Sequence, residues 1–86
     1  MSKDDDDPGE RGRVFAKIAP IIVAYYKANP RRQFHVEELR QHVLAWVPDI
    51  APDSPGRILR ELRQIGQLNY LVVNRRQSLY RFLVLL

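Results

Sequence analysis

The sequence predicts a small α+β domain in which three helices precede a C-terminal β-hairpin. The chain has 86 residues, of which 45% are hydrophobic, and this is material for a single core. Between residues 11 and 65, apolar side chains recur at the spacings of three and four that are typical of amphipathic helices. The last part of the chain instead has two short runs rich in Val, Tyr, Leu and Phe on either side of a polar turn.

The amino-terminal segment differs in composition from the rest of the chain. Residues 1–10 contain one lysine and five acidic side chains, four of them in the run Asp4–Asp7, and Pro8-Gly9 follows this run. Like charges repel each other and Pro-Gly breaks helices, so we expect a disordered acidic tail over 1–10 before a domain over 11–86. The tail lacks the apolar stretch of a secretory signal, and no apolar run approaches the roughly 20 residues of a membrane helix. We therefore expect a cytoplasmic protein, associated with the nucleoid or located in the host cytoplasm if it is viral, and without membrane contact.

The first helix is predicted over residues 11–28. Apolar side chains such as Val14, Ile18, Ile22 and Tyr25 form one face. Pro20 conflicts with this pattern, because a proline inside a helix removes a hydrogen bond and costs about 3 kcal/mol. Either the helix kinks at Pro20 or a second helical segment starts there. Asn29-Pro30 ends the helix, since the residue before a proline avoids helical geometry.

A short strand at 34–36 and a second helix at 37–47 follow. Leu39, Val43 and either Trp46 or Val47 would form the buried face of this helix. Its first turn carries two acidic residues, which suit the positive end of the helix dipole. Pro48 stops the helix.

The third helix is predicted over residues 54–65. Asp53 or Ser54 would cap it, and Pro55 falls near the first position, where a missing N–H is harmless. Gly66 occupies the position at which a left-handed residue usually closes a helix. The predicted buried stripe consists of Ile58, Leu59, Leu62 and Ile65.

The hairpin is predicted from apolar runs at 68–73 and 78–83 around the turn 74–77. The turn lacks glycine, so this signal is weaker than an Asn-Gly turn would give. The resulting order of helix, short strand, helix, helix and hairpin is that of a winged helix-turn-helix. In that arrangement the hairpin closes the open side of the three helices and projects its turn, the wing, beside the third helix.

Basic residues concentrate in the third helix and the wing. From residue 57 onward the chain has six arginines and a single acidic residue, Glu61, within an overall net charge of +4. Arg and Gln on the outer face of a helix suit guanine and adenine edges in the major groove, although the outer face of any amphipathic helix is also normally polar. The candidate DNA contacts of helix 54–65 are Ser54, Arg57, Arg60, Arg63 and Gln64.

The wing supplies a second set of candidate DNA contacts. Turns favour Gly, Asn, Asp, Ser and Pro, so two adjacent arginines are not required by the turn itself. A basic wing suits the phosphate backbone or the minor groove. The candidate residues of wing 74–77 are Asn74, Arg75, Arg76 and Gln77.

No pattern in the sequence indicates catalysis or metal binding. His35 and His42 are seven residues apart with Glu38 between them, whereas a zinc helix motif needs two histidines four residues apart. The chain has no cysteine and no glycine-rich phosphate loop, and it offers no nucleophile with a neighbouring base. We expect a protein that is not an enzyme and binds no cofactor or metal.

Residues 53–63, Gly66 and residues 70–80 together resemble winged helix-turn-helix domains of prokaryotic and phage proteins. These include domains appended to some restriction endonucleases, with an Arg-x-x-Arg-Glu-Leu-Arg helix before a glycine and a basic wing. The resemblance covers about residues 34–83 and implies double-stranded DNA binding, as a transcriptional regulator or a DNA-binding module. The acidic tail, Pro20 and the apolar end at 82–86 depart from the pattern.

The sequence is compatible with several alternatives. Winged helices also serve as protein-interaction modules, whose basic face would meet an acidic partner, and RNA or nonspecific nucleic-acid binding is a third hypothesis. The apolar end at 82–86 would complete the hairpin strand, pack on the first helix or form a homodimer contact. The acidic tail either keeps the chain soluble or folds back on the basic face and competes with DNA.

Overall fold

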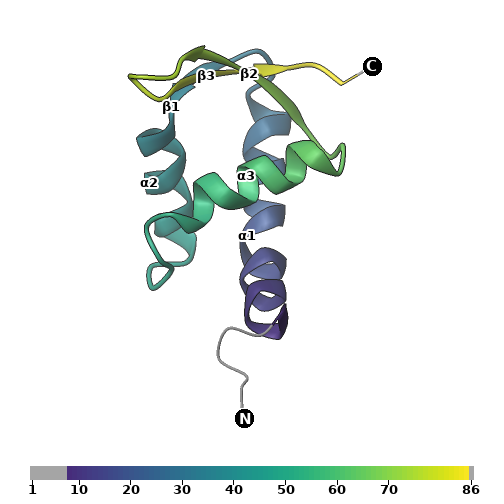
Figure 1. Ribbon diagram of the computed structural model, residues 1–86, viewed down its shortest axis with the longest axis vertical. Helices are drawn as coiled ribbons and strands as arrows, with labels where there is room; N and C mark the ends of the chain where they lie inside the picture. The colour runs from purple at the N-terminus through teal and green to yellow at the C-terminus, as the bar shows by residue number, and fades with distance from the viewer. Residues whose placement is uncertain (1–7, 86) are drawn as a thin grey trace.

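The fold consists of three helices and a three-stranded antiparallel sheet that lies across one end of the helices (Figure 1). The computed structural model describes residues 8–85. The strand order is β1-β3-β2, so the C-terminal strand lies in the middle of the sheet. This confirms the predicted α+β class, and the layout is compatible with a winged helix. In chain order the elements are α1 (Pro8–Ala28), β1 (Gln33–His35), α2 (Val36–Trp46), α3 (Ser54–Gln64), β2 (Asn69–Asn74) and β3 (Leu79–Leu83).

The helix α1 begins earlier than predicted. It starts at Pro8, so the expected boundary between a tail at 1–10 and a domain from residue 11 is wrong for residues 8–10. Proline is well tolerated in the first helical turn because its missing N–H would have no partner there. The rest of the expected tail, residues 1–7, lies outside the described residues. Pro20 lies exposed inside this single helix rather than starting a second one.

Aromatic side chains join α1 to the sheet at the centre of the core. Phe82 on β3 is fully buried, and its ring centroid lies 4.4 Å from that of Phe34 on β1 and 5.0 Å from that of Tyr26 on α1. The Tyr26 hydroxyl also donates to the backbone carbonyl of Leu83. These contacts fix the sheet against the C-terminal half of α1, because edge-to-face and offset ring pairs add to the burial of apolar area.

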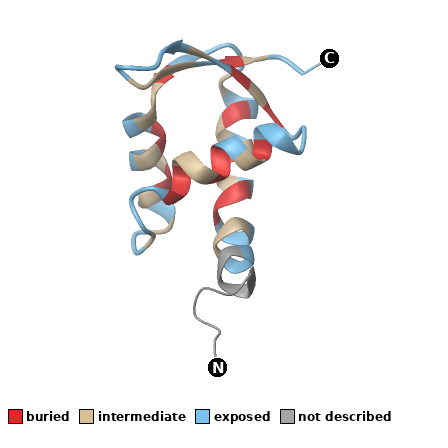
Figure 2. Cartoon of the chain, viewed as in Figure 1, coloured by how far each residue is buried: buried red, intermediate tan, exposed pale blue. Residues whose placement is uncertain are grey.

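The remaining core lies between the three helices, where Figure 2 shows the buried positions facing inward. Ile58, Leu59 and Leu62 on α3 are buried as predicted. Ile65 was predicted to continue this stripe, but it is 60% exposed. The reason is that α3 ends at Gln64, and Ile65 is already the residue that leaves the helix.

Gly66 closes α3 in the predicted way. It has a φ of 82°, and the N–H groups of Gly66 and Gln67 donate to the carbonyls of Arg63 and Leu62, at 3.2 and 2.9 Å. This pair of bonds is a Schellman motif, in which a left-handed residue satisfies the last carbonyls of the helix. The chain thereby turns from α3 directly into β2.

Two details of α2 and α3 differ from the predictions. Trp46, one of two candidates for the buried face of α2, is 70% exposed, while Val47 is half-buried. Asp53 is the N-cap residue of α3, but its side chain makes no capping hydrogen bond. At the start of α2, the cap is a histidine, since the backbone N–H of Glu37 donates to Nδ1 of His35 at 2.9 Å.

The hairpin between β2 and β3 has a four-residue turn at 75–78 and a bulge at Val73. The side-chain oxygen of Asn74 accepts the backbone N–H of Gln77 at 3.0 Å, and Ser78 takes a left-handed φ of 56° in place of the missing glycine. The carbonyl of Ser78 accepts the N–H of Val36 at 3.0 Å. The base of the hairpin is therefore bonded to the first residue of α2.

The aromatic core generates a prediction about stability. Replacing Phe82 by Ala (Phe82→Ala) removes the ring contacts to α1 and β1 and is expected to lower the free energy of unfolding by about 3–5 kcal/mol. Urea denaturation followed by circular dichroism would measure this loss. Val73→Ala, at an exposed bulge position in the same hairpin, is the control and should change stability by about 0.5 kcal/mol or less. Equal effects of the two variants would contradict the assignment of the core.

Candidate nucleic-acid interface

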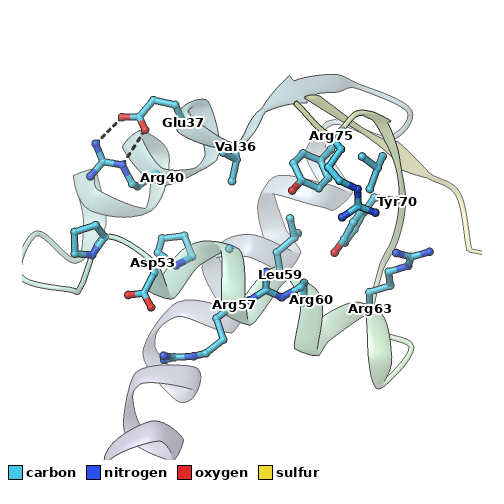
Figure 3. Close-up of a pocket in the computed structure, with 15 residues that line it drawn as sticks. Val36, Glu37, Arg40, Asp53, Arg57, Leu59, Arg60, Arg63, Tyr70 and Arg75 are labelled. Carbon is cyan, nitrogen blue, oxygen red and sulfur yellow. Dashed lines mark hydrogen bonds and ion pairs between the residues drawn. The ribbon is translucent and has the colours of Figure 1, made fainter. Parts of the chain in front are cut away.

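A cleft of about 610 Å³ lies between α3, the start of α2 and the hairpin (Figure 3). Part of its lining is apolar and includes Leu59, Val36 and Val72. The aromatic rings of Tyr70 and Tyr80 belong to the same lining. Five cations also line the cleft, namely Arg40 from α2, Arg57, Arg60 and Arg63 from α3, and Arg75 from the hairpin turn.

The helix α3 presents most of its predicted contact residues to this cleft. Arg60 and Arg63 are exposed and Arg57 is half-buried, and Figure 3 shows these three side chains leaving α3 in different directions. Gln64 is also exposed and borders a smaller hollow with Arg60, Arg63 and Tyr70. The amphipathic pattern of α3 thus explains why its polar face lies outward while Ile58 and Leu62 pack inward.

Ser54 does not belong to this exposed face. Its residue exposure is 3%, and it lies with Pro55 in the buried first turn of α3. A buried hydroxyl cannot contact DNA without a rearrangement of the helix start. The prediction that Ser54 is a DNA contact is therefore not supported by its position in the fold.

The hairpin turn contributes one of its predicted residues to the cleft and holds the others on its tip. Arg75 lines the cleft, whereas Asn74, Arg76 and Gln77 are exposed outside its lining. Asn74 has a structural role, because its side-chain oxygen accepts the backbone N–H of Gln77 inside the turn. The two adjacent arginines consequently lie at different places, one toward α3 and one on the outer tip.

Arg63 is held against the hairpin by an aromatic ring. Its guanidinium carbon lies 4.8 Å from the ring centroid of Tyr70, which is 2% exposed and packs edge-on against Tyr80 at 5.4 Å. A guanidinium over a tyrosine face is attracted by the ring and keeps its N–H donors free at the edge. The turn at Gly66 brings Arg63 and Tyr70 together, since it reverses the chain between α3 and β2.

The cleft arginines of α3 and the hairpin differ from Arg40 in their ion pairing. In the part of the chain that the structure describes, no ion pair involves Arg57, Arg60, Arg63 or Arg75. Four such guanidinium groups around one cleft outweigh the exposed carboxylate of Asp53 in its lining, raise its positive potential and leave planar N–H donors for phosphate oxygens. This part of the surface is suited to a polyanion.

Arg40 is the exception within the cleft, and sequence reasoning missed it. Its Nε and Nη2 donate to the two carboxylate oxygens of Glu37, with an Nε to Oε1 distance of 3.0 Å, and Gln41 donates to the same carboxylate at 3.0 Å. These hydrogen bonds, from Arg40 first and then from Gln41, lower the pKa of Glu37 from 4.5 to about 2. The i,i+3 spacing of Glu37 and Arg40 was visible in the sequence, but nothing there placed the start of α2 opposite α3.

His35, Glu38 and His42 each make contacts within the fold. His35 caps α2 through Nδ1, and the His42 ring lies 4.7 Å from the ring of Tyr25. Glu38 pairs with Arg32 at 3.2 Å. The contacts of these three residues therefore connect neighbouring elements of the fold.

No known protein family matches the chain, and no curated protein or solved structure shows significant similarity to it. The likeness to winged helix domains therefore rests on the residues and the layout of this chain alone. Among the helices of residues 8–85, none has an apolar stretch long enough to cross a membrane.

The Glu37–Arg40 pair generates a prediction about pH dependence. Because the pKa of Glu37 is lower in the folded chain than its ordinary 4.5, the pair stabilises the fold fully above pH 4.5, and this contribution is lost as the pH falls through about 2. Since the carboxylate is fully exposed, solvent screening keeps the effect small. We expect Glu37→Gln to flatten the fall in thermal stability between pH 4.5 and pH 2, measured by calorimetry. An unchanged pH profile would show that the pair does not form in solution.

Proposed function

We propose that this chain is a winged helix domain that binds double-stranded DNA, with α3 in the major groove and the hairpin turn on the adjacent backbone or minor groove. The observation that carries the proposal is the set of arginines around one cleft that have no acidic partner among residues 8–85. They come from α3 and from the hairpin turn, which are separate in the sequence and meet only through the fold. We propose a role as a transcriptional regulator or DNA-binding module that acts by binding, without catalysis.

The dimensions and chemistry of α3 support this placement. A helix with its side chains is about 10–12 Å across, and the major groove of B-DNA is about 12 Å wide. Arg57, Arg60 and Gln64 lie on the face of α3 opposite its buried stripe. Arg can donate two hydrogen bonds to a guanine edge, and Gln can pair with an adenine edge in the same way.

The mixed lining of the cleft supports contact with a sugar–phosphate strand. The strand that separates the major from the minor groove would run between α3 and the hairpin. Val36, Val72 and Tyr80 would then face its deoxyriboses, while Arg63 and Arg75 would donate to its phosphates. In this arrangement Arg76, on the outer tip of the turn, is free to follow the strand or enter the minor groove.

A second candidate function is a protein-interaction winged helix. One observation favours it, since Trp46 and Ile65, the two most exposed large apolar side chains among the described residues, each border an apolar hollow that Pro20 of α1 also lines. Exposed apolar patches of this kind commonly mark contacts with other proteins. A measurement of DNA binding at low salt would distinguish the two candidate functions.

The hairpin turn generates the first functional prediction. The double variant Arg75→Ala, Arg76→Ala should bind random-sequence duplex DNA more weakly than the wild type and with a shallower salt dependence. Each phosphate contact contributes about 0.9 to the slope of log affinity against log salt, so the loss of two should lower the slope by about 2. Fluorescence anisotropy over a salt series would measure both quantities.

The matched control for this experiment is Arg81→Ala. Arg81 lies on β3 in the same hairpin, is exposed and donates to Gln33 at 3.1 Å, and it does not line the cleft. It should leave the slope nearly unchanged. An equal loss in both variants would indicate a nonspecific effect of net charge, and no binding by the wild type at low salt would overturn the proposal in favour of the protein-interaction candidate.

The second functional prediction concerns sequence preference. Selection of bound duplexes from a random pool should enrich a motif with the wild type, and Arg60→Ala should lose the preference for one base pair of that motif. A good two-bond contact is worth about 1–3 kcal/mol of discrimination, or roughly 5- to 150-fold in relative affinity. Arg63→Ala, by contrast, should weaken binding to all sequences about equally. A motif that is identical for wild type and Arg60→Ala would remove Arg60 from the major groove.

A further inference from the structure

We propose that the hydroxyl of Tyr70 and the guanidinium of Arg63 together bind one backbone phosphate of the DNA duplex. The site is a small hollow of about 290 Å³ between α3 and β2, lined by Arg60, Arg63, Gln64 and Tyr70. Binding there rests on the proposed function, because the ligand is a phosphate of double-stranded DNA. The burial of Tyr70, the missing partner of its hydroxyl and the chemistry of the lining support this site.

The hydroxyl of Tyr70 has no hydrogen-bond partner among residues 8–85. The residue is 2% exposed, and its ring packs edge-on against the ring of Tyr80. Its backbone N–H donates to the side chain of Asn69, but its hydroxyl takes part in no hydrogen bond of the described chain. A tyrosine that is buried to this degree usually places its hydroxyl against a hydrogen-bond partner. We therefore expect the partner of this hydroxyl to come from a bound molecule.

The oxygen of this hydroxyl can be reached from outside. Among the fully buried side-chain nitrogen and oxygen atoms of residues 8–85, none lacks a hydrogen-bond partner. Since the Tyr70 hydroxyl makes no hydrogen bond, its oxygen is not fully buried, and the small exposed part of the residue includes it. Tyr70 lines both the cleft and the hollow, and Figure 3 shows its side chain extending from the hairpin toward α3. A ligand in the hollow can therefore contact this oxygen.

The described residues that line the hollow are all hydrogen-bond donors. They provide two guanidinium groups, one amide and one hydroxyl, whereas the lining of the larger cleft also includes the carboxylates of Glu37 and Asp53. The guanidinium carbon of Arg63 lies 4.8 Å from the ring centroid of Tyr70, so the charged donor and the neutral donor are neighbours. A phosphate has several acceptor oxygens and a negative charge, and it suits this combination of donors.

A phosphate in the hollow agrees with the path proposed for the DNA strand between α3 and the hairpin. Arg63 and Tyr70 lie on either side of the turn at Gly66, where the chain passes from α3 to β2. The packed ring fixes the direction of the Tyr70 hydroxyl, so little side-chain freedom is lost when it binds. Tyrosine hydroxyls and arginines are both common donors to DNA phosphates. Arg60 and Gln64, on the α3 side of the hollow, would remain available for base edges.

The variant Tyr70→Phe tests the hydroxyl, because it removes one oxygen and keeps the ring that Arg63 contacts. We expect it to bind random-sequence duplex DNA about five- to twentyfold more weakly than the wild type. Because a hydroxyl carries no charge, the slope of log affinity against log salt should stay unchanged, whereas Arg63→Ala should lower it by about 0.9. Fluorescence anisotropy over a salt series would measure both quantities. Urea denaturation should show no loss of stability in Tyr70→Phe, since no hydrogen bond of the described chain is removed.

The matched control is Tyr25→Phe, which removes a hydroxyl from α1 outside the lining of the cleft and should leave DNA affinity unchanged. If Tyr70→Phe binds as tightly as the wild type, the phosphate site is overturned and the proposed function stays intact. A salt slope lowered as much as in Arg63→Ala, or a loss of stability, would also overturn the site, because Tyr70 would then act by supporting Arg63 or the fold. If the wild type does not bind DNA at low salt, the proposed function and the phosphate site fail together.

Discussion

The position of the hairpin depends on the packing of Phe82 between Phe34 and Tyr26. These rings fix β3, the central strand, to β1 on one side and to α1 behind it. The helix α3 packs on α1 through a separate part of the core, so the distance between α3 and the hairpin is set indirectly, by the helix that both of them contact. The cleft exists because the two elements are anchored to α1 at different levels. The arginines on its two sides can therefore line one surface, with Arg63 of α3 contacting the hairpin through the ring of Tyr70.

The sequence was sufficient to predict those features of α3 that depend on local residue patterns. The stripe of Ile58, Leu59 and Leu62 and the closing turn at Gly66 follow from spacing and from the conformational freedom of glycine, and both are present in the structure. The sequence-based predictions are wrong or incomplete at the ends of helices and for contacts between secondary-structure elements. Trp46 is the last residue of α2 and Ile65 directly follows the last residue of α3, where the periodicity continues in the sequence but the packing partner does not. The pairing of β1 with β3, and with it the position of Arg40, depends on contacts across some 45 residues that no local pattern encodes.

The contrast between α2 and α3 shows how the same residue type serves different purposes. Arg40 on α2 is bound by a carboxylate one turn away, so its charge is compensated within its own helix. In α3 the acidic residue Glu61 does not pair with any arginine among the described residues, and the cations keep their donors available. Arg63 is oriented by the ring of Tyr70 instead of by a charge. An aromatic face orients a guanidinium without neutralising it, which suits the DNA-binding surface that we propose.

In the hairpin, the residues that stabilise the turn differ from the residues that are exposed at its tip. Ser78 must accept a left-handed backbone and bonds to Val36, and Asn74 closes the turn through its side chain. Among the described residues, the side chains of Arg76 and Gln77 are exposed and make no hydrogen bond or ion pair. Substitutions at the tip therefore cost little stability, whereas β-branched residues at position 78 would be strained. Evolution or design can alter the chemistry of the tip while the residues that fix the turn stay constant, so the surface that the hairpin displays can change without refolding the domain.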